Sequence, residues 1–214
     1  MNLLICGGSG FIGSEFIKNH LMRNADSKII NIDVLAIGSN LENLKDVENN
    51  PNYKFVKDDI RNESKINELV QDVDIVVNFA AESHVDRSIA NPKPFLETNI
   101  LGTFSILEAI RKHDKQFIHV STDEIYGDGE GKLSFNENSQ INPSNPYAAT
   151  KAGADHLVAS YYRTYGINCI TTRCTNNFGP NQFPEKLIPK TIIRSIKDLK
   201  VPLYGNGEQI RSWI

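Results

Sequence analysis

Short apolar runs rich in isoleucine and valine recur along the chain, and longer stretches of helical period separate most of them. The runs are Leu3 to Cys6, Lys28 to Ile32, Tyr53 to Val56, Ile75 to Val77, Phe117 to Val120 and Asn168 to Thr172. Near-continuous apolar strands are typical of a parallel sheet that is covered on both faces, with the intervening helices as right-handed crossovers. The pattern predicts an α/β fold with a doubly wound parallel sheet of the Rossmann type.

Two segments depart from this alternation. Ser121 to Pro146 is polar and contains Gly127, Gly129, Gly131 and Pro143, which predicts a long loop, and loops of that length are commonly functional. After Cys174 a segment rich in proline and asparagine precedes a predicted helix from Glu185 to Ile196.

The end of the chain has the pattern of a β-hairpin. Val201 to Tyr204 and Gln209 to Ile214 flank the turn sequence Gly205-Asn206-Gly207. Because the last expected strand is apolar and has no sequence after it, we expect that the natural polypeptide continues. This region is expected to lie outside the sheet domain.

Charge and composition exclude several classes of protein. The 23 basic and 26 acidic residues give a net charge of -3 without a basic cluster, which argues against a nucleic-acid partner. Leu3 to Cys6 is too short for a signal-peptide core or a membrane span, so a soluble cytoplasmic protein is expected. Cys6, Cys169 and Cys174 lack the spacing of a metal site, so neither a metal nor a disulfide is expected.

A glycine-rich motif follows the first expected strand. Gly7, Gly10 and Gly13 permit a tight turn and a close approach of the backbone to pyrophosphate, and the helix that follows offers free N–H groups. Asp33 ends the second expected strand, 20 residues beyond Gly13. A carboxylate there can bind the adenosine ribose hydroxyls and would repel a 2′-phosphate. The motif therefore predicts an NAD site, which we assign to residues 1–173.

A second acidic position follows the third expected strand. The carboxylate of Asp59, next to Ile60, could receive the adenine amino group, or it could be a plain surface acid in a turn.

Tyr147 and Lys151 are four residues apart at the start of a helix expected to run to about Tyr165. This spacing places both side chains on one helical face. A phenol normally ionises near pKa 10, and a nearby ammonium would lower that pKa. Tyr147 could then take a proton from a substrate hydroxyl as hydride leaves for NAD.

Two adjacent acids, Asp123 and Glu124, follow the fifth expected strand at its carboxyl end, where open α/β sheets bind ligands. Thr122 could hydrogen-bond the reacting hydroxyl or the tyrosine. Asp123 and Glu124 suit an elimination of water, which requires both a base and an acid. The alternative is that both are loop acids facing water.

These motifs together resemble the extended short-chain dehydrogenase/reductase superfamily, and within it the dTDP-glucose 4,6-dehydratases. The resemblance covers essentially the whole chain. Its distinctive segments are Gly7 to Gly13, Ala80 to Ser88, Ser121 to Gly127, Tyr147 with Lys151, and Arg173 to Pro180 continuing into Phe183 to Leu187.

The resemblance implies a lyase that oxidises C4, eliminates water across C5 and C6, and returns hydride to C6. Tyr147 would be the base for C4 oxidation, assisted by Thr122, and Lys151 would lower its pKa and hold the nicotinamide ribose. Glu124 would remove the C5 proton and Asp123 would protonate the leaving C6 hydroxyl. The product would be dTDP-4-keto-6-deoxyglucose, with NAD restored.

The resemblance also implies two sets of binding residues. The NAD site would be lined by Phe11, Ile12, Asp33, Asp59, Ile60, Ala80, Ala81, Thr98 and Asn177, besides the glycines, Tyr147 and Lys151. The nucleotide sugar would meet Ser83, Thr122, Asn176, Lys186, Leu187, Pro202, Tyr204 and Arg211. Residues 174–214 would form an incomplete substrate-binding region, because the family's substrate domain extends further.

Alternatives remain open. UDP-sugar 4-epimerases share the NAD fold and the Tyr/Lys pair but need no acid and base for elimination. GDP-mannose dehydratases and UDP-glucuronate decarboxylases are closer, although the adjacent acids fit them less well. A further alternative is an NAD-binding module without turnover.

The superfamily resemblance also implies a homodimer. The expected helices Pro92 to Lys112 and Ala149 to Tyr165 have apolar faces that would pair with a second subunit.

Overall fold

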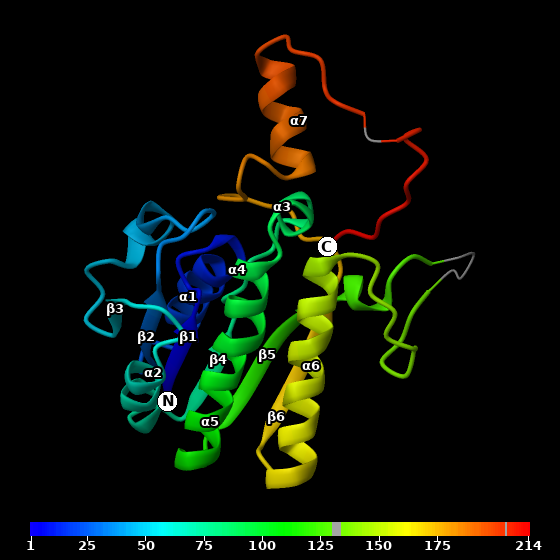
Figure 1. The fold of residues 1–214 in the computed structure, drawn as a ribbon. Helices are drawn as coiled ribbons and strands as arrows, with labels where there is room; N and C mark the ends of the chain where they lie inside the picture. The colour runs from blue at the N-terminus through cyan, green and yellow to red at the C-terminus, as the bar shows by residue number, and fades with distance from the viewer. Residues whose placement is uncertain (130–133, 204) are drawn as a thin grey trace. The chain divides into compact units, whose positions relative to one another are not determined.

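The structure, a computed structural model, describes residues 1–129, 134–203 and 205–214. All six expected strands are present: β1 (Asn2–Cys6), β2 (Lys28–Asp33), β3 (Tyr53–Lys57), β4 (Ile75–Asn78), β5 (Gln116–Thr122) and β6 (Cys169–Cys174). They form one parallel sheet in the order β3-β2-β1-β4-β5-β6 (Figure 1). This order confirms the predicted doubly wound sheet, and it reverses direction between β1 and β4, where such sheets bind ligands.

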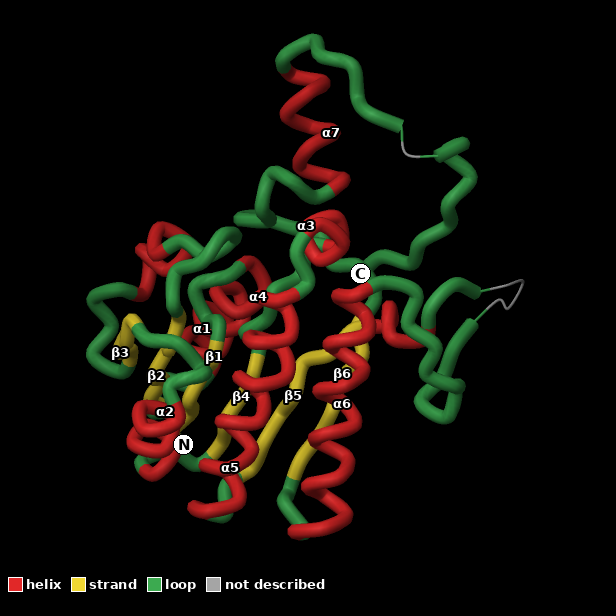
Figure 2. Tube along the Cα trace, viewed as in Figure 1, coloured by secondary structure: helices red, strands yellow, loops and turns green. Residues whose placement is uncertain are grey.

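Within residues 1–174, helices connect the strands and lie against the sheet (Figure 2). The longer helices of that part are α1 (Phe11–Arg23), α2 (Glu63–Gln71), α5 (Thr103–His113) and α6 (Pro146–Tyr165), and residues 175–214 contain α7 (Leu187–Ile196). Shorter turns are η1 (Leu41–Val47), α3 (Val85–Ala90), α4 (Lys93–Phe95), η2 (Leu96–Gly102) and η3 (Asp123–Tyr126).

The alternation of side chains along β1 divides the core into two layers. Leu4 faces the layer that includes Ile106 of α5 and Val158 of α6, whereas Ile5 faces the layer that includes Ile17 of α1. Each of these five residues is at most 1% exposed. A strand that is buried on both faces has to be apolar at consecutive positions, which explains why β1 reads as an unbroken apolar run.

The expected helix from Pro92 to Lys112 is not one regular α-helix. A π-helical segment, η2, separates α4 from α5. Within it the side chain of Asn99 is 1% exposed and hydrogen-bonds outside its own helix, and Gly102 lies directly against Ile60. π-helical turns are rare and are frequently found at functional sites.

The expected long loop from Ser121 to Pro146 begins later than predicted. Ser121 and Thr122 belong to β5, and η3 follows at once. Gly131 lies outside the described residues.

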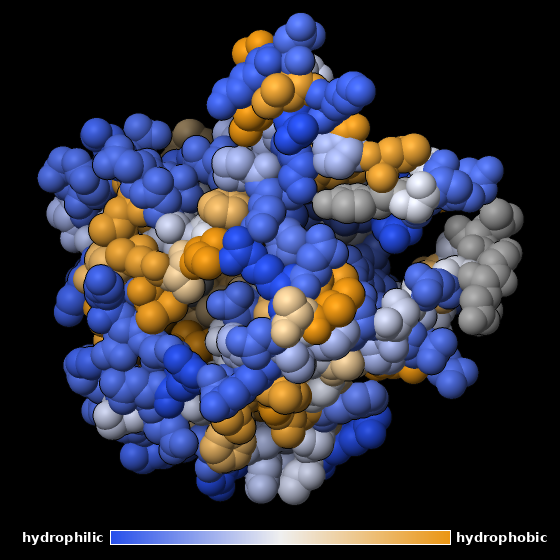
Figure 3. All heavy atoms as spheres, turned by 45° about the horizontal axis from the view of Figure 1, so that its top comes forward, coloured by the Kyte–Doolittle hydropathy of each residue, from blue (hydrophilic) through white to orange (hydrophobic). Residues whose placement is uncertain are grey.

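The contacts divide the chain into two compact units, Met1–Cys174 and Thr175–Ile214. In the second unit α7 begins two residues after the expected start, and its side chains of Leu187, Ile192 and Ile196 are exposed. Apolar side chains lie among polar ones at the top of the space-filling view (Figure 3). Among the helices that the structure describes, none has the length and apolar character needed to cross a membrane.

The hairpin prediction is wrong. The described residues on both sides of the Gly205-Asn206-Gly207 turn form no paired strands, and Trp213 instead makes an isolated parallel bridge with Asn176. The physical reason is that the apolar side chains there bury nothing against each other: Leu203 is 73% exposed and Ile210 is 90% exposed. A two-stranded ribbon without an apolar face to cover is marginal in water.

Candidate active site

The glycine-rich turn after β1 lies against the end of β4. Gly7 has φ of 75°, and a Cβ atom placed on it would lie 2.6 Å from the backbone of Ala80. A Cβ on Gly13 would lie 2.6 Å from the carbonyl oxygen of Gly7. Both positions therefore require glycine, one for its backbone conformation and both for close packing.

Helix α1 starts directly after this turn. Its N-cap residue is Gly10, which has no side chain to bond the N–H groups of the first turn. Phe11 and Ile12 occupy that turn, and Ile12 is 37% exposed. Unbonded N–H groups at a helix N-terminus form a binding site for an anion such as pyrophosphate.

Asp33 is fixed in place at the end of β2. One of its carboxylate oxygens accepts hydrogen bonds from the Ser9 backbone N–H (3.0 Å) and the Ser39 hydroxyl (3.2 Å), and the other accepts from the Leu35 N–H (2.8 Å). Asp33 is 5% exposed. The carboxylate is thus held rigidly at the carboxyl edge of the sheet, on the same side as the glycine turn.

Asp59 follows β3 and is paired with a cation. The Arg61 guanidinium donates to its carboxylate at 2.7 Å and also reaches Glu97 at 3.1 Å. Partial burial would raise the pKa of the Asp59 carboxyl, but the bonds from Arg61 outweigh it and hold the pKa below its usual value. The neighbouring Ile60 is 5% exposed and packs on Gly102.

The loop after β4 and the π-helical segment hold the other expected cofactor contacts in this unit. The Ala80 N–H donates to the Asn78 side chain at 3.1 Å, and Ala81 and Thr98 are half-buried. Ser83, expected to face the substrate, is exposed in the same loop.

The acid pair lies in η3, at the carboxyl end of β5. Thr122 is the N-cap of this turn, and its hydroxyl accepts a hydrogen bond from the Glu124 N–H at 3.3 Å. The Thr122 hydroxyl also lies 3.4 Å from a carboxylate oxygen of Asp123. The side-chain amide of Asn145 donates to the Glu124 carboxylate at 3.3 Å. Glu124 is therefore tied to the start of α6.

Tyr147 is the second residue of α6. Its backbone N–H donates to the Ser88 hydroxyl at 3.1 Å, and its ring packs edge-on against Phe95 at 6.5 Å. Burial and the charge of Glu124 raise the pKa of the Tyr147 phenol above its usual value, while a hydrogen bond with Thr122 acts in the opposite direction. The Tyr147 phenol therefore interacts with both Thr122 and Glu124 at the carboxyl end of β5.

Lys151 lies one turn further along α6 and is 3% exposed. Its ammonium donates to the Val120 carbonyl oxygen at 2.8 Å. Burial lowers the pKa of Lys151 to about 8, although Asp155 and Cys174 favour the charged form. The sequence led us to expect that Lys151 lowers the pKa of Tyr147. This role stays a prediction; in the structure burial and the charge of Glu124 raise the pKa of the phenol, and the ammonium is bonded to β5.

The remaining expected site residues belong to the second compact unit. Lys186 is the N-cap of α7 and Leu187 is its first residue. The Arg211 guanidinium donates to the neighbouring Ile210 carbonyl, and Tyr204 lies outside the described residues. The others are Asn176, Asn177 and Pro202. Their roles stay predictions. No cluster of three or more potential metal ligands occurs among the described residues.

Comparison with known proteins places this arrangement in a family. The family model described as GDP-mannose 4,6 dehydratase matches residues 4–214. The chain is 47% identical to the low-salt glycan biosynthesis protein Agl12 of Haloferax volcanii and 45% identical to dTDP-glucose 4,6-dehydratase of Escherichia coli, over its whole length. It spans 69% of the first relative and 65% of the second.

Solved structures agree with these relatives. The dTDP-glucose 4,6-dehydratase DesIV of Streptomyces venezuelae, a double mutant with NAD and DAU bound, superposes with a TM-score of 0.96 at 42% identity over all of this chain and 68% of that one. The chain belongs to the dTDP-glucose 4,6-dehydratase family. UDP-glucuronic acid 4-epimerase of Bacillus cereus is also similar in fold, with a TM-score of 0.94, but its identity is only 29%, over all of this chain and 68% of that one.

The hydrogen bonds of the structure also identify polar residues that sequence reasoning did not assign to the site. The Asn99 amide donates to the Glu82 carbonyl (3.0 Å) and to the Thr150 hydroxyl (2.9 Å), and its oxygen accepts from the Glu82 N–H (2.9 Å). It thereby joins the loop after β4 to α6. Ser88 and Asn145 likewise fix the start of α6. A lone asparagine between Thr98 and Ile100, inside an apolar helical stretch, was the available signal for Asn99.

Proposed function

We propose that this chain is the NAD-binding part, with some of the substrate-binding part, of an enzyme that converts dTDP-glucose to dTDP-4-keto-6-deoxyglucose. The observation that carries the proposal is the acid pair Asp123-Glu124, which sits in η3 beside the Tyr147 phenol. Oxidation alone would need only the tyrosine and lysine. Two additional carboxyl groups suit an elimination of water, in which one acts as base and the other as acid.

The chain's own residues fit NAD. The glycine turn at Gly7 leaves no room for a side chain against Ala80, α1 presents unbonded N–H groups, and Asp33 is fixed where the ribose hydroxyls would lie. Such a carboxylate would repel the 2′-phosphate of NADP. Crystal structures of relatives with bound NAD support this assignment.

In the first step Tyr147 would take the proton of the C4 hydroxyl while hydride leaves C4. Bound NAD would supply the hydride acceptor and a positive ring charge, which would oppose the effects that raise the pKa of Tyr147. Thr122 would hold the phenol and the sugar hydroxyl in line. Lys151 would hold the nicotinamide ribose with the ammonium that now bonds to Val120.

In the second step Glu124 would remove the C5 proton, which is acidified by the adjacent C4 ketone. Asp123 would protonate the C6 hydroxyl as it leaves as water. Return of the hydride to C6 and of a proton to C5 would then complete the reaction, so that the sugar loses one water and the cofactor is restored. The hydride removed from C4 is the one returned to C6, so the reaction needs no external reductant.

The proposal is tested by incubating the purified protein with NAD and, separately, dTDP-glucose, UDP-glucose and GDP-mannose, without a reductant. We expect loss of one water from dTDP-glucose. Water loss from another nucleotide sugar would change the substrate, and formation of an epimer at unchanged mass would identify an epimerase. Binding of NAD without any conversion would refute the dehydratase and favour a binding module.

Glu124→Gln separates the two steps. We expect water elimination to fall by about two to three orders of magnitude, because a general base contributes roughly that much. Oxidation at C4 should survive, because removal of the Glu124 charge eliminates a contribution that raises the pKa of Tyr147. Mass spectrometry of quenched single turnovers should show a product lacking two hydrogens and retaining its water.

Glu42→Gln is the matched control. Glu42 is an exposed acid that pairs with Lys45, three residues away, and it is not one of the expected site residues. It should leave both steps unchanged. If Glu124→Gln eliminates water at the normal rate, Glu124 is not the base.

We propose in addition that the NAD-binding domain comprises residues 1–173, that residues 174–214 form part of the substrate-binding region, and that the protein acts in the cytoplasm as a homodimer. The observation behind the dimer is an apolar groove lined by Pro92, Leu96, Ile100, Pro146, Ala149 and Thr150. It lies between the two helical segments that were expected to pair with a second subunit. Light scattering of the purified protein would refute the dimer if it gave the mass of one chain.

A further inference from the structure

The segment that carries the acid pair has little structure of its own. η3 is a single 3-10 turn of four residues, and Gly127 follows it with φ of 75°. One such turn contains very few hydrogen bonds, and nucleation of a helical turn is unfavourable, so its position depends on tertiary contacts. Ile125 and Tyr126 anchor it, being 0% and 6% exposed.

Tyr126 makes a polar contact with Arg173 of β6. The Arg173 guanidinium donates to the Tyr126 hydroxyl at 2.8 Å and lies over the same ring at 5.3 Å from its centre. The Phe135 ring stacks on the Tyr126 ring, with 5.1 Å between the ring centres. Arg173 therefore fixes both the hydroxyl and the ring plane of Tyr126.

The same guanidinium also bonds to the helix that carries Tyr147 and Lys151. Its Nε atom donates at 2.9 Å to Asp155, whose side chain is 2% exposed and lies one turn after Lys151 on α6. Arg173 thus bridges η3 and α6 from the end of β6. A guanidinium carries its N–H donors on separate nitrogen atoms in one plane, so that Nε bonds Asp155 while Nη1 bonds Tyr126.

Arg173 is the cation bonded directly to Asp155, and the ammonium of Lys151 also interacts favourably with this carboxylate. His119 of β5 lies 3.6 Å from Asp155, but burial, and then the charge of Lys151, hold the pKa of His119 well below its usual value. Its imidazole is therefore neutral. Burial opposes the charge of Arg173, yet the bonds with Tyr126 and Asp155 keep its pKa above the usual value.

We propose that Arg173 is a positioning residue that holds Asp123 and Glu124 in register with Tyr147 and Lys151, by bonding Tyr126 and Asp155 simultaneously. As far as turnover is concerned, this inference rests on the proposed function. Asn145, whose amide bonds the Glu124 carboxylate, makes a second link between η3 and α6 near the start of that helix. The acid pair is thereby held from both sides.

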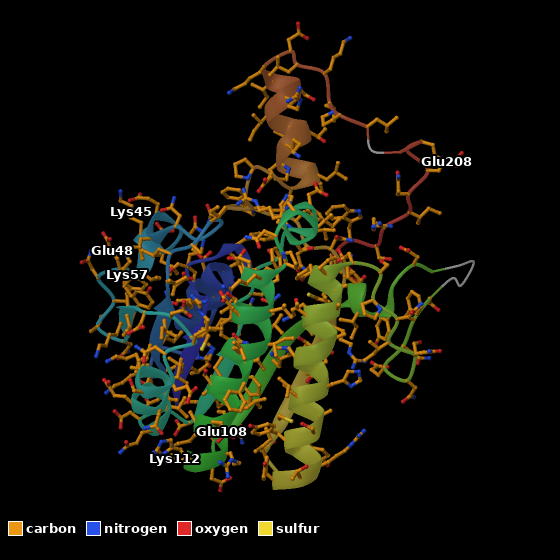
Figure 4. All side chains as sticks on the ribbon, viewed as in Figure 1. Lys45, Glu48, Lys57, Glu108, Lys112 and Glu208 are labelled. Carbon is orange, nitrogen blue, oxygen red and sulfur yellow. The ribbon has the colours of Figure 1, made fainter. Side chains whose placement is uncertain are left out.

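Tyr126→Phe tests the bridge without removing a charge. It deletes the hydroxyl that accepts from Arg173 and keeps the ring against Phe135 and the guanidinium. Tyr161→Phe is the matched control: Tyr161 is 8% exposed, and its hydroxyl donates to the charged Glu108 at 2.6 Å. Glu108 lies toward the lower end of α5 (Figure 4), away from the carboxyl ends of the strands.

For Tyr126→Phe we expect kcat to fall roughly tenfold, about 1.4 kcal/mol in the barrier, with KM little changed. Because Glu124 of the acid pair removes the C5 proton, the isotope effect on kcat with substrate deuterated at C5 should increase. A residue with a merely structural role would lower the amount of folded protein without changing this isotope effect. Tyr161→Phe should change neither quantity.

Hydrogen exchange provides a readout that needs no turnover. Amides of residues 122–128 should exchange several-fold faster in Tyr126→Phe than in the wild type, and at the wild-type rate in Tyr161→Phe. Unchanged exchange and an unchanged isotope effect in Tyr126→Phe would overturn the proposal. If the wild type converts no nucleotide sugar, the proposed function fails, and exchange alone decides whether Arg173 holds this segment.

Discussion

Tyr147→Phe is expected to lower kcat for dTDP-glucose by about three orders of magnitude, because general-base catalysis typically contributes 10²–10⁴-fold. The loss should be chemical. The backbone N–H of residue 147 would still donate to Ser88, and the ring would still pack on Phe95. NAD affinity and the melting temperature should therefore stay close to those of the wild type, as measured by calorimetry and circular dichroism.

Tyr162→Phe is a suitable control, since Tyr162 lies on the same helix and is 59% exposed. It should retain full activity. A Tyr147→Phe variant that keeps more than a tenth of the wild-type kcat would show that another group accepts the C4 hydroxyl proton.

The sheet and its ligand-binding edge were predictable because local patterns determine them. β1 is buried on both faces, so its sequence is apolar at consecutive positions, and the glycine turn follows it directly. The position of Asp33 at the end of β2 follows from the same reasoning. These features depend on residues that are neighbours in sequence.

The features that could not be predicted depend on contacts between distant segments. The π-helical turn at Leu96–Gly102 contains Asn99, whose side chain hydrogen-bonds Glu82 and Thr150. The helical period of the sequence does not identify either partner. The hairpin prediction failed for a related reason. Turn residues were present, but no apolar surface covers the exposed side chains of Leu203 and Ile210.

The electrostatics of the Tyr/Lys pair also required the structure. Spacing of four residues predicts that two side chains share a helical face, but it does not say which partner the ammonium bonds. Lys151 donates to the carbonyl oxygen of Val120, 31 residues away in sequence. The charge of Glu124, which acts on Tyr147, comes from the same strand end.

Lys151→Met is expected to abolish most activity and, at neutral pH, to stabilise the fold. The pKa of Lys151 is lowered from 10.5 to about 8 by burial. At 1.36 kcal/mol per unit this corresponds to a cost of roughly 3 kcal/mol for burying the ammonium below pH 8. Methionine has a similar shape without the charge, and it forfeits one hydrogen bond of about 1 kcal/mol. A net gain of about 2 kcal/mol should raise the melting temperature by roughly 4–8 °C.

The pH dependence gives the sign of this effect. Between about pH 8 and 10.5 the unfolded chain still binds the Lys151 proton and the folded chain has released it, so the wild type should gain stability as pH rises through this window. Lys151→Met should lack that gain. Lys112→Met, at an exposed lysine of α5 (Figure 4), should keep it. If Lys151→Met were instead less stable than the wild type at pH 7, with the same dependence on pH, the buried ammonium would be stabilising. Lys151 would then be retained for the fold as much as for the chemistry, whereas the expected result means that the site keeps a destabilising charge for function.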